Sequence, residues 1–382
     1  MSAALVQQPL FEDVVTVPPT EGVKYAGSKL KLLPHIIELV RSTDARTILD
    51  GFSGTTRVSQ ALSQLGYKLI ANDVAVWSKV FGDCYLLNKR PPSYYRALID
   101  HLNALPPQFG WFSEHYGGSP ETDSSKDANG LKKPWQLHNT MKLDAIRAEI
   151  DVLELDEIEK AVALTSLILA LDTVDNTIGH YSSYLNRWSP RSYKTMQLKV
   201  PRLIPQQADH LVFQKDIFDV LGDVSVDLAY FDPPYGSNNE KMPPSRVRYA
   251  AYYHLWTTVI LNDRPALFGK AKRRRDTSDR LSASVFEEFR RNPDTGRFIA
   301  VEAIEQMLMA VDARYIILSY SSGGRATAEE LHEAIRKAGK LLKVINVDYR
   351  QNVMAGMKWT NEWIREDETH PHHEFLFLIE KF

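Results

Sequence analysis

Cysteine and long apolar runs are nearly absent from this sequence. Of its 382 residues only Cys84 is a cysteine, which excludes a disulfide framework and a cysteine-rich zinc site and is typical of a reducing compartment. The longest apolar run, AVALTSLILAL at 161–171, falls short of the roughly 18 residues of a membrane-spanning helix. Residues 1–23 carry no basic start and no long apolar core, so no signal peptide is expected. We therefore expect a cytoplasmic protein without a membrane segment.

An excess of charge of either sign is also missing. The 46 basic and 48 acidic residues give a formal net charge of −2, which argues against a uniformly basic surface. Any contact with a nucleic acid must therefore come from local clusters of basic residues. The 44% of hydrophobic and 25% of charged residues are typical of a folded, soluble enzyme with one large domain or two modest ones.

The sequence does contain an alternation of strand and helix patterns. Residues 1–23 are aperiodic and contain proline, and we expect a flexible arm there. Beyond them, apolar runs that predict strands alternate with segments of helical periodicity, which is typical of a doubly wound α/β sheet with helices on both faces. The predicted strands lie at 46–52, 68–74, 210–217, 226–232, 314–321, 343–349 and 374–380.

This alternation is lost in the middle of the chain, between residues 85 and 209. A polar stretch, GGSPETDSSKDANG at 117–130, is followed there by helical sequence and then by basic and aromatic sequence. We interpret 85–209 as an inserted domain. The α/β domain would then consist of residues 24–84 and 210–382.

Two predicted strand ends carry a pattern that suits a nucleoside, and ligands of an open α/β sheet bind at such ends. At the first, Gly51 and Gly54 allow a tight turn and Asp50 adds a carboxylate, although glycines at such a turn often serve the turn alone. Asp73 ends the next strand 23 residues after Asp50, about the spacing at which an acid binds ribose hydroxyls. The pattern G-x-G-x-x-G is absent, so a nucleoside without a pyrophosphate fits better than a nicotinamide or flavin cofactor.

A third strand end, LAYFDPPYGSN at 228–238, indicates a more specific chemistry. Pro233 and Pro234 donate no backbone hydrogen bond, so the strand must end and its last carbonyls remain free as acceptors. Asp232 adds a carboxylate and Tyr235 a flat face, which together suit an amino group attached to a planar ring. Fixed acceptors would stabilise the positive charge that such an amine gains when it attacks a methyl group. The alternative is a plain proline turn with a surface aspartate.

Four segments, in this order, resemble the Dam-like alpha group of DNA adenine-N6 methyltransferases, which are often partners of restriction enzymes. The resemblance covers most of the chain, from about Lys24 to Glu380. One departure is Thr56, which replaces the second glycine of the family's F-x-G-x-G, so we expect a less tight turn. The matching segments are KYAGSK at 24–29, LDGFSGTTRVS at 49–59, FDPPYG at 231–236 and HEFLFLI at 373–379.

The resemblance implies a Rossmann-like domain that uses S-adenosylmethionine, with a seven-stranded sheet, an antiparallel hairpin at one end and an inserted target-recognition domain. It further implies that Asp73 binds the ribose of the cofactor, that Asp216 and Ile217 flank its adenine, and that the D-P-P-Y motif holds the target base. The implied cofactor residues are Tyr25, Lys29, Asp50, Phe52, Gly54, Asp73, Asp216 and Ile217, and the implied catalytic residues are Asp232, Pro233, Pro234 and Tyr235.

Two basic clusters are candidates for holding DNA, whose target base must be flipped out of the duplex to react. The cluster at 186–202 has five basic residues and no acid, interleaves Trp188 and Tyr193, and lies in the insertion that the family uses for target recognition. The cluster GKAKRRR at 269–275 is equally typical of a solvated surface, and its role stays open. The candidate DNA-binding residues are Arg187, Arg191, Tyr193 and Lys194.

We therefore expect a site-specific DNA adenine-N6 methyltransferase of a restriction-modification system, which acts on double-stranded DNA and whose cognate endonuclease would act independently. Cytosine-N4 or RNA adenine methylation and a non-catalytic nucleic-acid-binding protein on this fold remain alternatives. Cytosine carbon-5 methylation is disfavoured because it requires a cysteine nucleophile, and Cys84 has no adjacent proline. The histidines of HPHH at 370–373 have no cysteine beside them, and we expect no metal.

Overall fold

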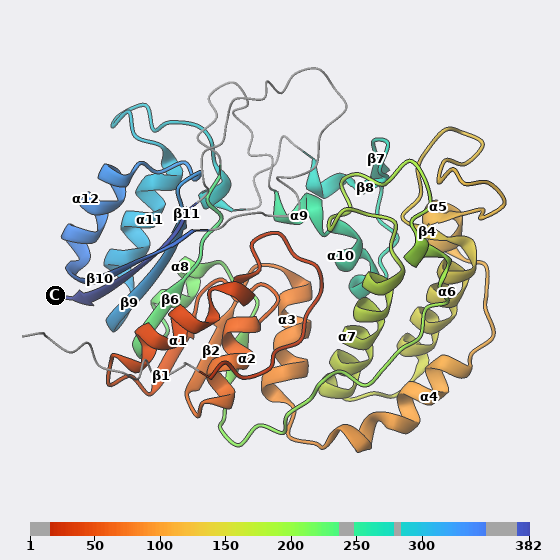
Figure 1. The fold of residues 1–382 in the computed structure, drawn as a ribbon, viewed down its shortest axis with the longest axis horizontal. Coiled ribbons are helices and arrows are strands. Elements are labelled where there is room, and N and C mark those ends of the chain that lie inside the picture. Colours follow the sequence, from red (N-terminus) through yellow and green to blue (C-terminus); the bar gives the residue numbers. More distant parts are fainter. Residues whose placement is uncertain (1–15, 237–247, 279–283, 349–372) are drawn as a thin grey trace, which may run out of the picture.

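The fold is built on one mixed sheet, to which the described part of the chain contributes seven strands. The computed structural model describes residues 16–236, 248–278, 284–348 and 373–382. The strands of this sheet run parallel except β11, which is antiparallel to both of its neighbours (Figure 1). In sheet order they are β10 (Gly339–Asp348), β11 (His373–Lys381), β9 (Asp312–Ser321), β6 (Ser225–Phe231), β1 (Thr47–Asp50), β2 (Lys68–Asn72) and β5 (Leu211–Phe213). The predicted α/β sheet with an antiparallel pair at one end is confirmed.

Each of the seven predicted strands is present, and most bounds differ by a few residues. The clearest difference is β5, which ends at Phe213 although the pattern predicted a strand over 210–217. The carboxylate of Asp216 accepts a hydrogen bond of 3.0 Å from the backbone N–H of Phe218 and caps helix α8 (Ile217–Leu221). Because such a cap starts a helix, the chain leaves the sheet earlier than predicted.

Helices cover both faces of the sheet, because successive residues of a strand point to opposite faces. In β1, for example, Ile48 packs into the core below α1 and α2, whereas Leu49 packs into the core on the other face, below α8, α11 and α12. The covering helices are α1 (Leu33–Arg41), α2 (Arg57–Gln64), α11 (Ile299–Ala310) and α12 (Ala328–Ala338), together with α8. This arrangement confirms the Rossmann-like fold.

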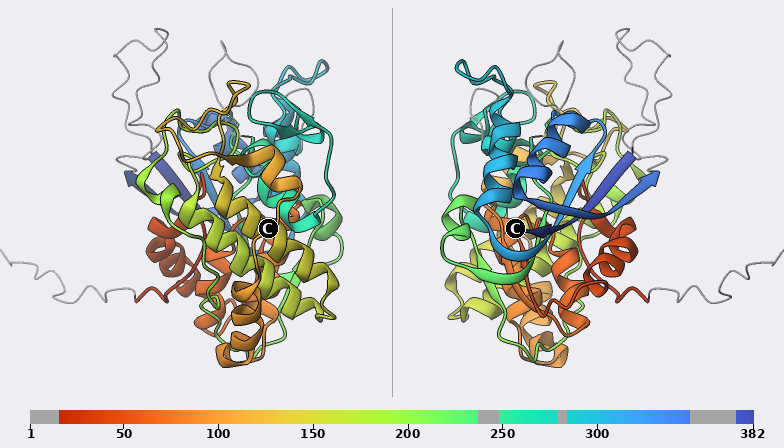
Figure 2. Two further views of the ribbon diagram at one scale, coloured as in Figure 1. Left: turned by 90° about the vertical axis from the view of Figure 1, so that its right-hand side faces the viewer. Right: turned by 90° about the vertical axis from the view of Figure 1, so that its left-hand side faces the viewer.

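A body of helices packs beside the sheet, on the right in Figure 1, and faces the viewer in the left panel of Figure 2. Its core joins helices of the inserted region to α10, whose Trp256 and Val259 are buried within it. The insertion predicted at 85–209 therefore shares a core with residues that follow the D-P-P-Y motif, and its boundaries stay a prediction. The elements of this body are α3 (Val76–Gly82), α4 (Arg96–Ala104), α5 (Trp111–Tyr116), α6 (Leu137–Val152), α7 (Glu157–Val174), α9 (Tyr249–Tyr252), α10 (His254–Leu261), β7 (Leu267–Phe268) and β8 (Arg273–Arg274).

The longest apolar run of the sequence forms the centre of α7, where Leu164, Leu167 and Leu171 are buried in the core of the helical body. A helix that is apolar on all sides is expected in such an interior. Among the helices of the described residues, none combines the length and the apolar character that crossing a membrane requires.

The start of the described chain differs from the predicted flexible arm at 1–23. Residues 1–15 lie outside the described residues, but residues 16–23 are packed against the protein. The side chain of Val23 is buried in the core of the helical body, and the backbone N–H of Glu21 donates to the side chain of Gln60 at 2.9 Å. The Glu21 carboxylate also accepts a hydrogen bond from the Tyr85 hydroxyl at 2.9 Å. An aperiodic sequence can still be ordered when distant residues bind it.

β1 and β6 are neighbours in the sheet, and later strands of the chain are added on opposite sides of this pair. From β1 the sheet continues to β2 and β5 on one side, and from β6 to β9, β11 and β10 on the other. Asp50, the last residue of β1, lies beside Tyr230 of β6. A crevice forms beyond the carboxyl ends of the strands at such a switch point, and ligands of open α/β sheets bind there.

Candidate active site

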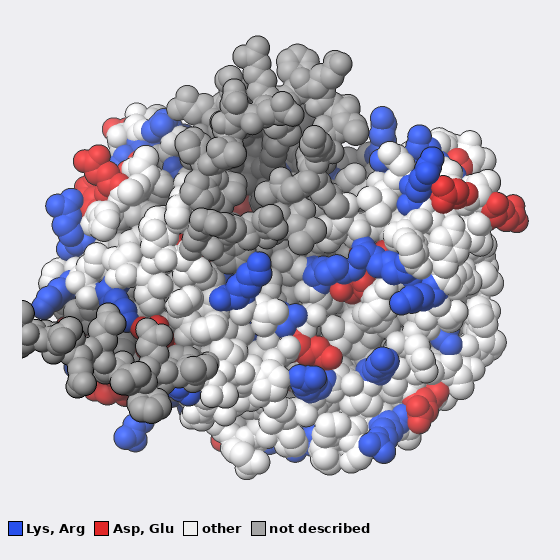
Figure 3. Space-filling view, in the orientation of Figure 1, with Lys and Arg blue, Asp and Glu red and all other residues white. Residues whose placement is uncertain are grey.

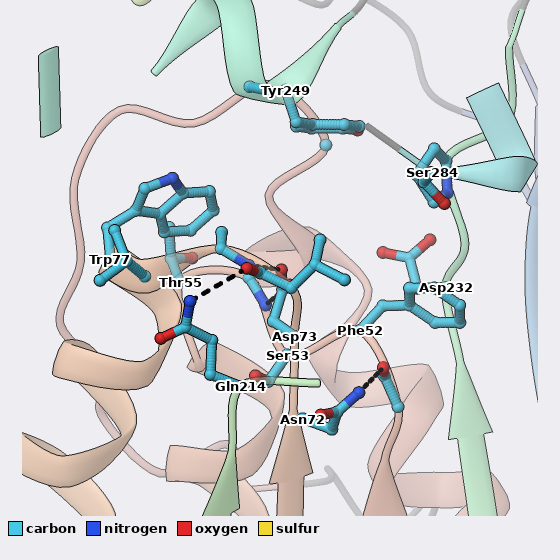
Figure 4. Close-up of a pocket in the computed structure, with 18 of the residues that line it drawn as sticks. Phe52, Ser53, Thr55, Asn72, Asp73, Trp77, Gln214, Asp232, Tyr249 and Ser284 are labelled. Carbon is cyan, nitrogen blue, oxygen red and sulfur yellow. Dashed lines mark hydrogen bonds between the residues drawn. The ribbon is translucent and has the colours of Figure 1, made fainter. Parts of the chain in front are cut away.

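A cavity of about 520 Å³ opens at this switch point, within the range of small-molecule sites. It is lined by the residues that follow β1, β2, β5 and β6. Figure 4 shows Trp77 and Asp232 on opposite sides of the cavity, with Tyr249 above Asp73. The lining includes all eight residues predicted to hold a cofactor, namely Tyr25, Lys29, Asp50, Phe52, Gly54, Asp73, Asp216 and Ile217.

The turn after β1 forms the floor of the cavity and has glycine-like backbone angles at two positions. Gly54 has φ +49° and Thr56 has φ +60°, so both lie in the left-handed region that favours glycine. The structure therefore differs from the expectation that Thr56 relaxes the turn. The Thr56 hydroxyl donates to the carbonyl of Thr55 at 2.8 Å and accepts from the side chain of Gln60 at 3.0 Å. These bonds help to hold Thr56 in a backbone conformation that branched residues seldom adopt.

Asp50 is buried at the end of β1 with only half of its carboxylate satisfied. Its Oδ2 accepts a hydrogen bond of 2.6 Å from the hydroxyl of Ser59, whereas Oδ1 has no hydrogen-bond partner among the described residues. Burial raises the pKa of Asp50 to about 7, although the hydrogen bond from Ser59 opposes the rise. A buried acceptor without a donor is costly, so this oxygen suits a ligand that brings a hydrogen-bond donor or a positive charge.

Asp73 follows β2 and fastens the glycine turn from the other side. Its Oδ2 accepts from the backbone N–H of Gly54 and its Oδ1 from that of Ala75, both at 2.9 Å. Burial raises the pKa of Asp73, and these two N–H donors oppose the rise. Each oxygen of the carboxylate keeps a second lone pair, so Asp73 can still accept hydrogen bonds from hydroxyl groups of a ligand.

Aromatic side chains form the walls of the cavity. The Tyr25 ring lies 5.4 Å from Tyr249, 4.8 Å from Tyr253 and 5.5 Å from Trp77, measured between ring centroids. On the opposite wall, the ring of Phe52 meets that of Phe286 edge to face at 5.2 Å. Flat apolar walls of this kind suit the planar rings of nucleosides.

Asp232, directly after β6, belongs to a buried network of charges. The ammonium group of Lys29 lies 3.0 Å from Asp232 Oδ1 and 2.8 Å from Oε1 of Glu374, the second residue of β11. Burial raises the pKa of Asp232, Lys29 lowers it, and the nearby charge of Glu374 raises it again. The two carboxylates in turn raise the pKa of Lys29, although burial by itself would lower it. The charged forms of Lys29 and Asp232 therefore stabilise each other inside the protein.

Tyr235 occupies a different place from the one its sequence pattern suggested. We expected its ring to present a flat face to the target base, but Tyr235 is not among the described residues that line the cavity. Its hydroxyl donates to the carboxylates of Asp232 and Glu374 and accepts from Lys29 at 2.7 Å. Its ring packs against Tyr320 at 4.8 Å. Tyr249 presents its ring to the cavity instead (Figure 4).

The other predicted catalytic and cofactor residues divide between the cavity surface and its support. Pro234 lines the cavity, whereas Pro233 is buried and is not part of the described lining. Asp216 caps α8, and Ile217 packs into the core behind the glycine turn, where a methyl group on Gly51 would come within 3.0 Å of it. The site roles of these residues stay predictions.

The candidate DNA-binding residues lie outside this cavity, and they differ in whether their side chains are exposed or hydrogen-bonded to the protein. The side chain of Arg187 is 83% exposed, and Tyr193 and Lys194 are also exposed. Arg191 is bound inward, since its guanidinium donates to the carbonyls of Asp175 and Thr177 at 2.6 Å each. The nearby Trp188 is buried and donates to the carbonyl of Ser119, so it is not free to stack on a base. Of the three basic candidates, Arg187 and Lys194 keep exposed side chains, and Arg187 lies 3.4 Å from the carboxylate of Asp123.

The second basic cluster forms a small hairpin, β7 and β8, at the rim of the cavity. Two buried tyrosines of the insertion hold its tip, because the hydroxyls of Tyr184 and Tyr116 donate to the carbonyls of Ala271 and Lys272 at 2.8 Å each. Arg274 lines the cavity and is paired with Asp263 and Asp276. Lys270 and Arg275 are exposed to solvent, and Figure 3 shows basic side chains on this face in several small groups.

Of the three histidines of HPHH, the structure describes only His373. His370 and His372 lie outside the described residues, and His373 begins β11. Within residues 16–236, 248–278, 284–348 and 373–382, no group of three or more His, Cys, Asp or Glu side chains is arranged to hold a metal ion.

Sequence reasoning missed several residues of the site, of which Glu374, Tyr249 and Trp77 are the most important. Glu374 was visible as a single acid at the start of the apolar run EFLFLI. A charge buried with such a run needs a partner that compensates it. Tyr249 belongs to the aromatic stretch YAAYYHLW at 249–256, and Trp77 follows Asp73 by one helical turn. Neither spacing distinguishes a ligand-facing ring from a core residue.

Three known proteins are similar to nearly all of this chain. The type II methyltransferase M.NlaIII of Neisseria lactamica is 27% identical over 371 residues, which cover 94% of this chain and 99% of that protein. The modification methylase StsI of Streptococcus sanguinis is 26% identical over 379 residues, and the type II methyltransferase M.FokI of Planomicrobium okeanokoites is 24% identical over 370 residues. The last two alignments cover 94% of this chain but only 52% and 53% of those proteins, so the chain spans about half their length.

The family described as D12 class N6 adenine-specific DNA methyltransferase matches residues 25–286, which include the glycine turn, Asp73 and the D-P-P-Y motif. The match extends over more than half of the chain, in agreement with the family that the sequence motifs indicated. This protein therefore belongs to the D12 class of N6 adenine-specific DNA methyltransferases.

Proposed function

We propose that this protein is a site-specific DNA methyltransferase that transfers a methyl group from S-adenosylmethionine to the N6 amine of a flipped-out adenine, as the modification component of a restriction-modification system. One observation carries the proposal. Asp232 of the D-P-P-Y motif lines the same cavity as the residues predicted to hold the cofactor. A methyl donor in this cavity would lie beside the carboxylate that receives the amine.

The polar groups of the cavity suit S-adenosylmethionine. Oδ1 of Asp50, which has no partner within the described part of the chain, fits the ammonium group of the methionine part. The remaining lone pairs of Asp73 fit the ribose hydroxyls. Asp216 and Ile217 would flank the adenine. When bound, S-adenosylmethionine supplies a methyl carbon attached to a positively charged sulfur.

Asp232 and the backbone of the D-P-P-Y turn would act on the amine of the target base. The amine nitrogen would form a bond to the methyl carbon as the carbon–sulfur bond breaks, and the sulfur would keep that electron pair as a neutral thioether. The nitrogen would gain positive charge in this step and then release one proton to water. The Asp232 carboxylate accepts a hydrogen bond from that amine and so stabilises the charge as it forms. Because burial raises the pKa of Asp232, the carboxylate is a stronger acceptor than a solvated one.

A base that leaves the duplex loses its stacking partners, and the enzyme must replace them. We assign this role to Tyr249 in place of Tyr235, since the Tyr249 ring lines the cavity while the Tyr235 hydroxyl is bonded to Asp232 and Glu374. Tyr249 rests on the ring of Tyr25 at 5.4 Å, which would orient it for stacking.

Duplex DNA would be held by the exposed residues of the two basic clusters. Arg187, Tyr193 and Lys194 present exposed side chains on the inserted region. Lys270 and Arg275 do so on the β7–β8 hairpin, beside the cavity. Contacts to phosphates position the protein on DNA and do not depend on the base sequence, so the recognition sequence must be read by other contacts.

The experiment that tests this function identifies the product. Purified protein is incubated with duplex DNA and S-adenosylmethionine, the DNA is digested, and the modified nucleoside is identified by mass spectrometry. We expect N6-methyladenine in one sequence context, and Asp232→Ala should lower the single-turnover rate by at least about 100-fold with little change in cofactor affinity. Long-read sequencing of DNA from cells that express the protein gives the context.

Other outcomes would favour the alternatives. N4-methylcytosine in the digest, or methylation of RNA and not of DNA, would replace the proposed substrate. A protein that binds DNA but neither binds nor consumes S-adenosylmethionine would be a nucleic-acid-binding protein on a methyltransferase fold. A cognate endonuclease that acts independently is part of the proposal, and cutting of unmethylated but not methylated DNA in the same cells would reveal it.

A further inference from the structure

Glu374 lies in the site although it belongs neither to the glycine turn nor to the D-P-P-Y motif. Because β11 runs antiparallel to its neighbours, its first residues lie beside the carboxyl end of β9, where Glu374 pairs with Ser321. The side chain of Glu374 is only 10% exposed. An acid is seldom buried to this degree unless a partner compensates its charge.

The partners of Glu374 are also the partners of Asp232. The Lys29 ammonium donates to Glu374 Oε1 at 2.8 Å and to the Tyr235 hydroxyl at 2.7 Å, and it lies 3.0 Å from Asp232 Oδ1. These contacts use all three N–H donors of a lysine. The Tyr235 hydroxyl contacts both carboxylates and has a single hydrogen to share between them, and Ser319 donates to Glu374 at 3.0 Å.

The charges in this network do not cancel. With both acids ionised, two carboxylates face one ammonium group, so the network has a net charge of about −1. If Glu374 were absent, Lys29 would neutralise Asp232 alone. A neutralised carboxylate would stabilise a developing positive charge less well, because opposite charges act most strongly in a water-excluded site.

We propose that Glu374 is a positioning residue for methyl transfer: it takes up the charge of Lys29 and, through Lys29 and Tyr235, holds Asp232 with an uncompensated negative charge toward the cavity. The inference rests on the proposed function, because Asp232 needs this charge only if an amine becomes positive beside it. Glu374 itself is not part of the cavity lining among the described residues and acts through its neighbours.

Other titratable groups also influence Asp232, and the test must separate them from Glu374. Of the two nearest charges, Lys29 lowers the pKa of Asp232 and Glu374 raises it. The remaining titratable side chains of the described residues that act on Asp232 or respond to its charge are Tyr235, Asp50, Tyr25, Tyr230 and Tyr249. Glu374→Gln changes one charge in this set and leaves the others in place.

The first measurement does not depend on enzymatic activity. Protein labelled with carbon-13 at the aspartate carboxyl groups is titrated by NMR without DNA, and the Asp232 signal is assigned by its loss in Asp232→Asn. In Glu374→Gln the titration midpoint of Asp232 should move to lower pH by about one unit, because a like charge is removed and Lys29 acts on Asp232 alone. Glu380→Gln is the matched control, since Glu380 lies on the same strand at the far end and should leave the midpoint unchanged.

The second measurement is the single-turnover rate of methylation. Glu374→Gln should lower it about 10-fold or more while DNA affinity stays unchanged, and Glu380→Gln should match the wild type. Glu374→Asp keeps the charge but shortens the reach, so it should restore the midpoint of Asp232 and still react more slowly than the wild type.

The inference is overturned if the Asp232 midpoint in Glu374→Gln stays at its wild-type value, or if Glu374→Asp shifts it as much as Glu374→Gln does. A wild-type protein that methylates nothing would contradict the proposed function instead. The NMR titration would still decide, in that case, whether Glu374 controls the charge of Asp232.

Discussion

Three of the carboxylates that line the cavity have environments that differ in ways that matter for chemistry. Asp73 is bonded to two backbone N–H groups, Asp232 is paired with Lys29, and Asp50 has one oxygen without a partner among the described residues. The same residue type can therefore fasten a turn, accept a hydrogen bond from an amine or bind a cation. Two predictions at the scale of single residues follow from these differences.

Asp50→Asn should stabilise the protein at high pH and weaken cofactor binding. The folded pKa of Asp50 is raised to about 7, so the folded state holds this proton more tightly than the unfolded state does. This contribution to stability is complete below the ordinary aspartate pKa and is lost as the pH rises through about 7. The melting temperature of Asp50→Asn should therefore rise relative to that of the wild type as the pH increases from 3.8 to about 7, and the difference should stay constant at higher pH.

The cofactor affinity of the wild type should rise as the pH passes about 7, whereas its stability falls. Calorimetry of the wild type should give tighter S-adenosylmethionine binding at pH 8 than at about pH 6, because ionised Asp50 would pair with the ammonium group. Asp50→Asn should bind weakly at both pH values, whereas Asp219→Asn, an exposed change in α8, should behave as the wild type. A wild-type affinity that does not depend on pH would contradict the assignment of Asp50.

Tyr235→Phe should lower the single-turnover rate of methylation about 10-fold, with cofactor affinity little changed. Stacking alone would need only the ring, but the hydroxyl of Tyr235 donates to Asp232 and accepts from Lys29. Removing it frees the Asp232 carboxylate to rotate. Tyr315→Phe, in the core on the other side of β9, is the control. A Tyr235→Phe enzyme as fast as the wild type would mean that the hydroxyl does not position Asp232.

At the scale of elements, one basic segment contains residues with opposite roles. The segment 186–194 looks uniform in sequence, yet Arg187 and Lys194 are exposed while Arg191 binds Asp175 at 2.7 Å. The side chain of Asp175 is only 1% exposed, so it depends on such partners. Charge in a segment therefore predicts DNA contact only for those side chains that the fold leaves exposed.

Alanine substitutions should separate these roles. Arg187→Ala and Lys194→Ala should weaken DNA binding equally for all sequences and each reduce the slope of log affinity against log salt by about 1, with unchanged melting temperature. Arg191→Ala should instead destabilise the protein by about 2 kcal/mol, since Asp175 loses a charged partner. Anisotropy titrations and thermal unfolding measure the two effects. Loss of stability in Arg187→Ala and not in Arg191→Ala would reverse the assignment.

The β7–β8 hairpin is the second element expected to meet DNA. Replacing Lys270, Lys272 and Arg275 by alanine together should weaken DNA binding at least about 10-fold and lower the salt slope by roughly 3. Cofactor affinity should not change, because none of these three side chains is part of the described cavity lining.

The matched control for the hairpin removes three basic side chains at the opposite end of the sheet. Lys68 is the first residue of β2, Lys340 is the second residue of β10, and Arg336 lies in the last turn of α12, all away from the carboxyl ends that form the site. Equal loss of DNA affinity in both triple variants would show that net charge, and not the hairpin, holds DNA.

At the scale of the whole molecule, the cavity joins the sheet to the helical body. Strand ends supply Asp50 and Asp73, while Trp77, Tyr249 and Thr257 come from helices of that body. A ligand in this cavity would contact both parts, so its binding energy should stabilise the complete fold and not one region alone.

Saturation with S-adenosylmethionine should therefore raise the melting temperature in a single transition. At 100 times the dissociation constant the stabilisation should be about 2.7 kcal/mol. Asp73→Asn should lose most of this effect at the same concentration, since a weaker ribose contact lowers affinity by about 1.5–3 kcal/mol. The ligand-induced rise of Asp73→Asn is measured from the melting temperature of that variant without ligand, because Asp73 also accepts a hydrogen bond from the glycine turn. An equal ligand-induced rise in both proteins would exclude Asp73 from cofactor binding.

The sequence by itself determined the sheet, the family and eight of the residues that line the cavity. The strands could be predicted because apolar runs and turn residues are local signals. Asp50, Gly54 and Asp73 could be predicted to lie together because they follow strand ends, and parallel strands end at one edge of the sheet. The other five cofactor positions, Tyr25, Lys29, Phe52, Asp216 and Ile217, were implied by the resemblance to the family. Such inferences need only neighbours in sequence and the general geometry of the fold.

Only the tertiary structure decided what individual side chains do within that frame. Lys29 and Glu374 are 345 positions apart, and Lys29 and Tyr235 are 206 apart, yet all three form one network. The inward bonding of Arg191, the burial of Trp188 and the order of residues 16–23 likewise depend on partners from distant segments. A hydrogen bond depends on distances and angles that the whole fold sets, and no local pattern of residues contains them.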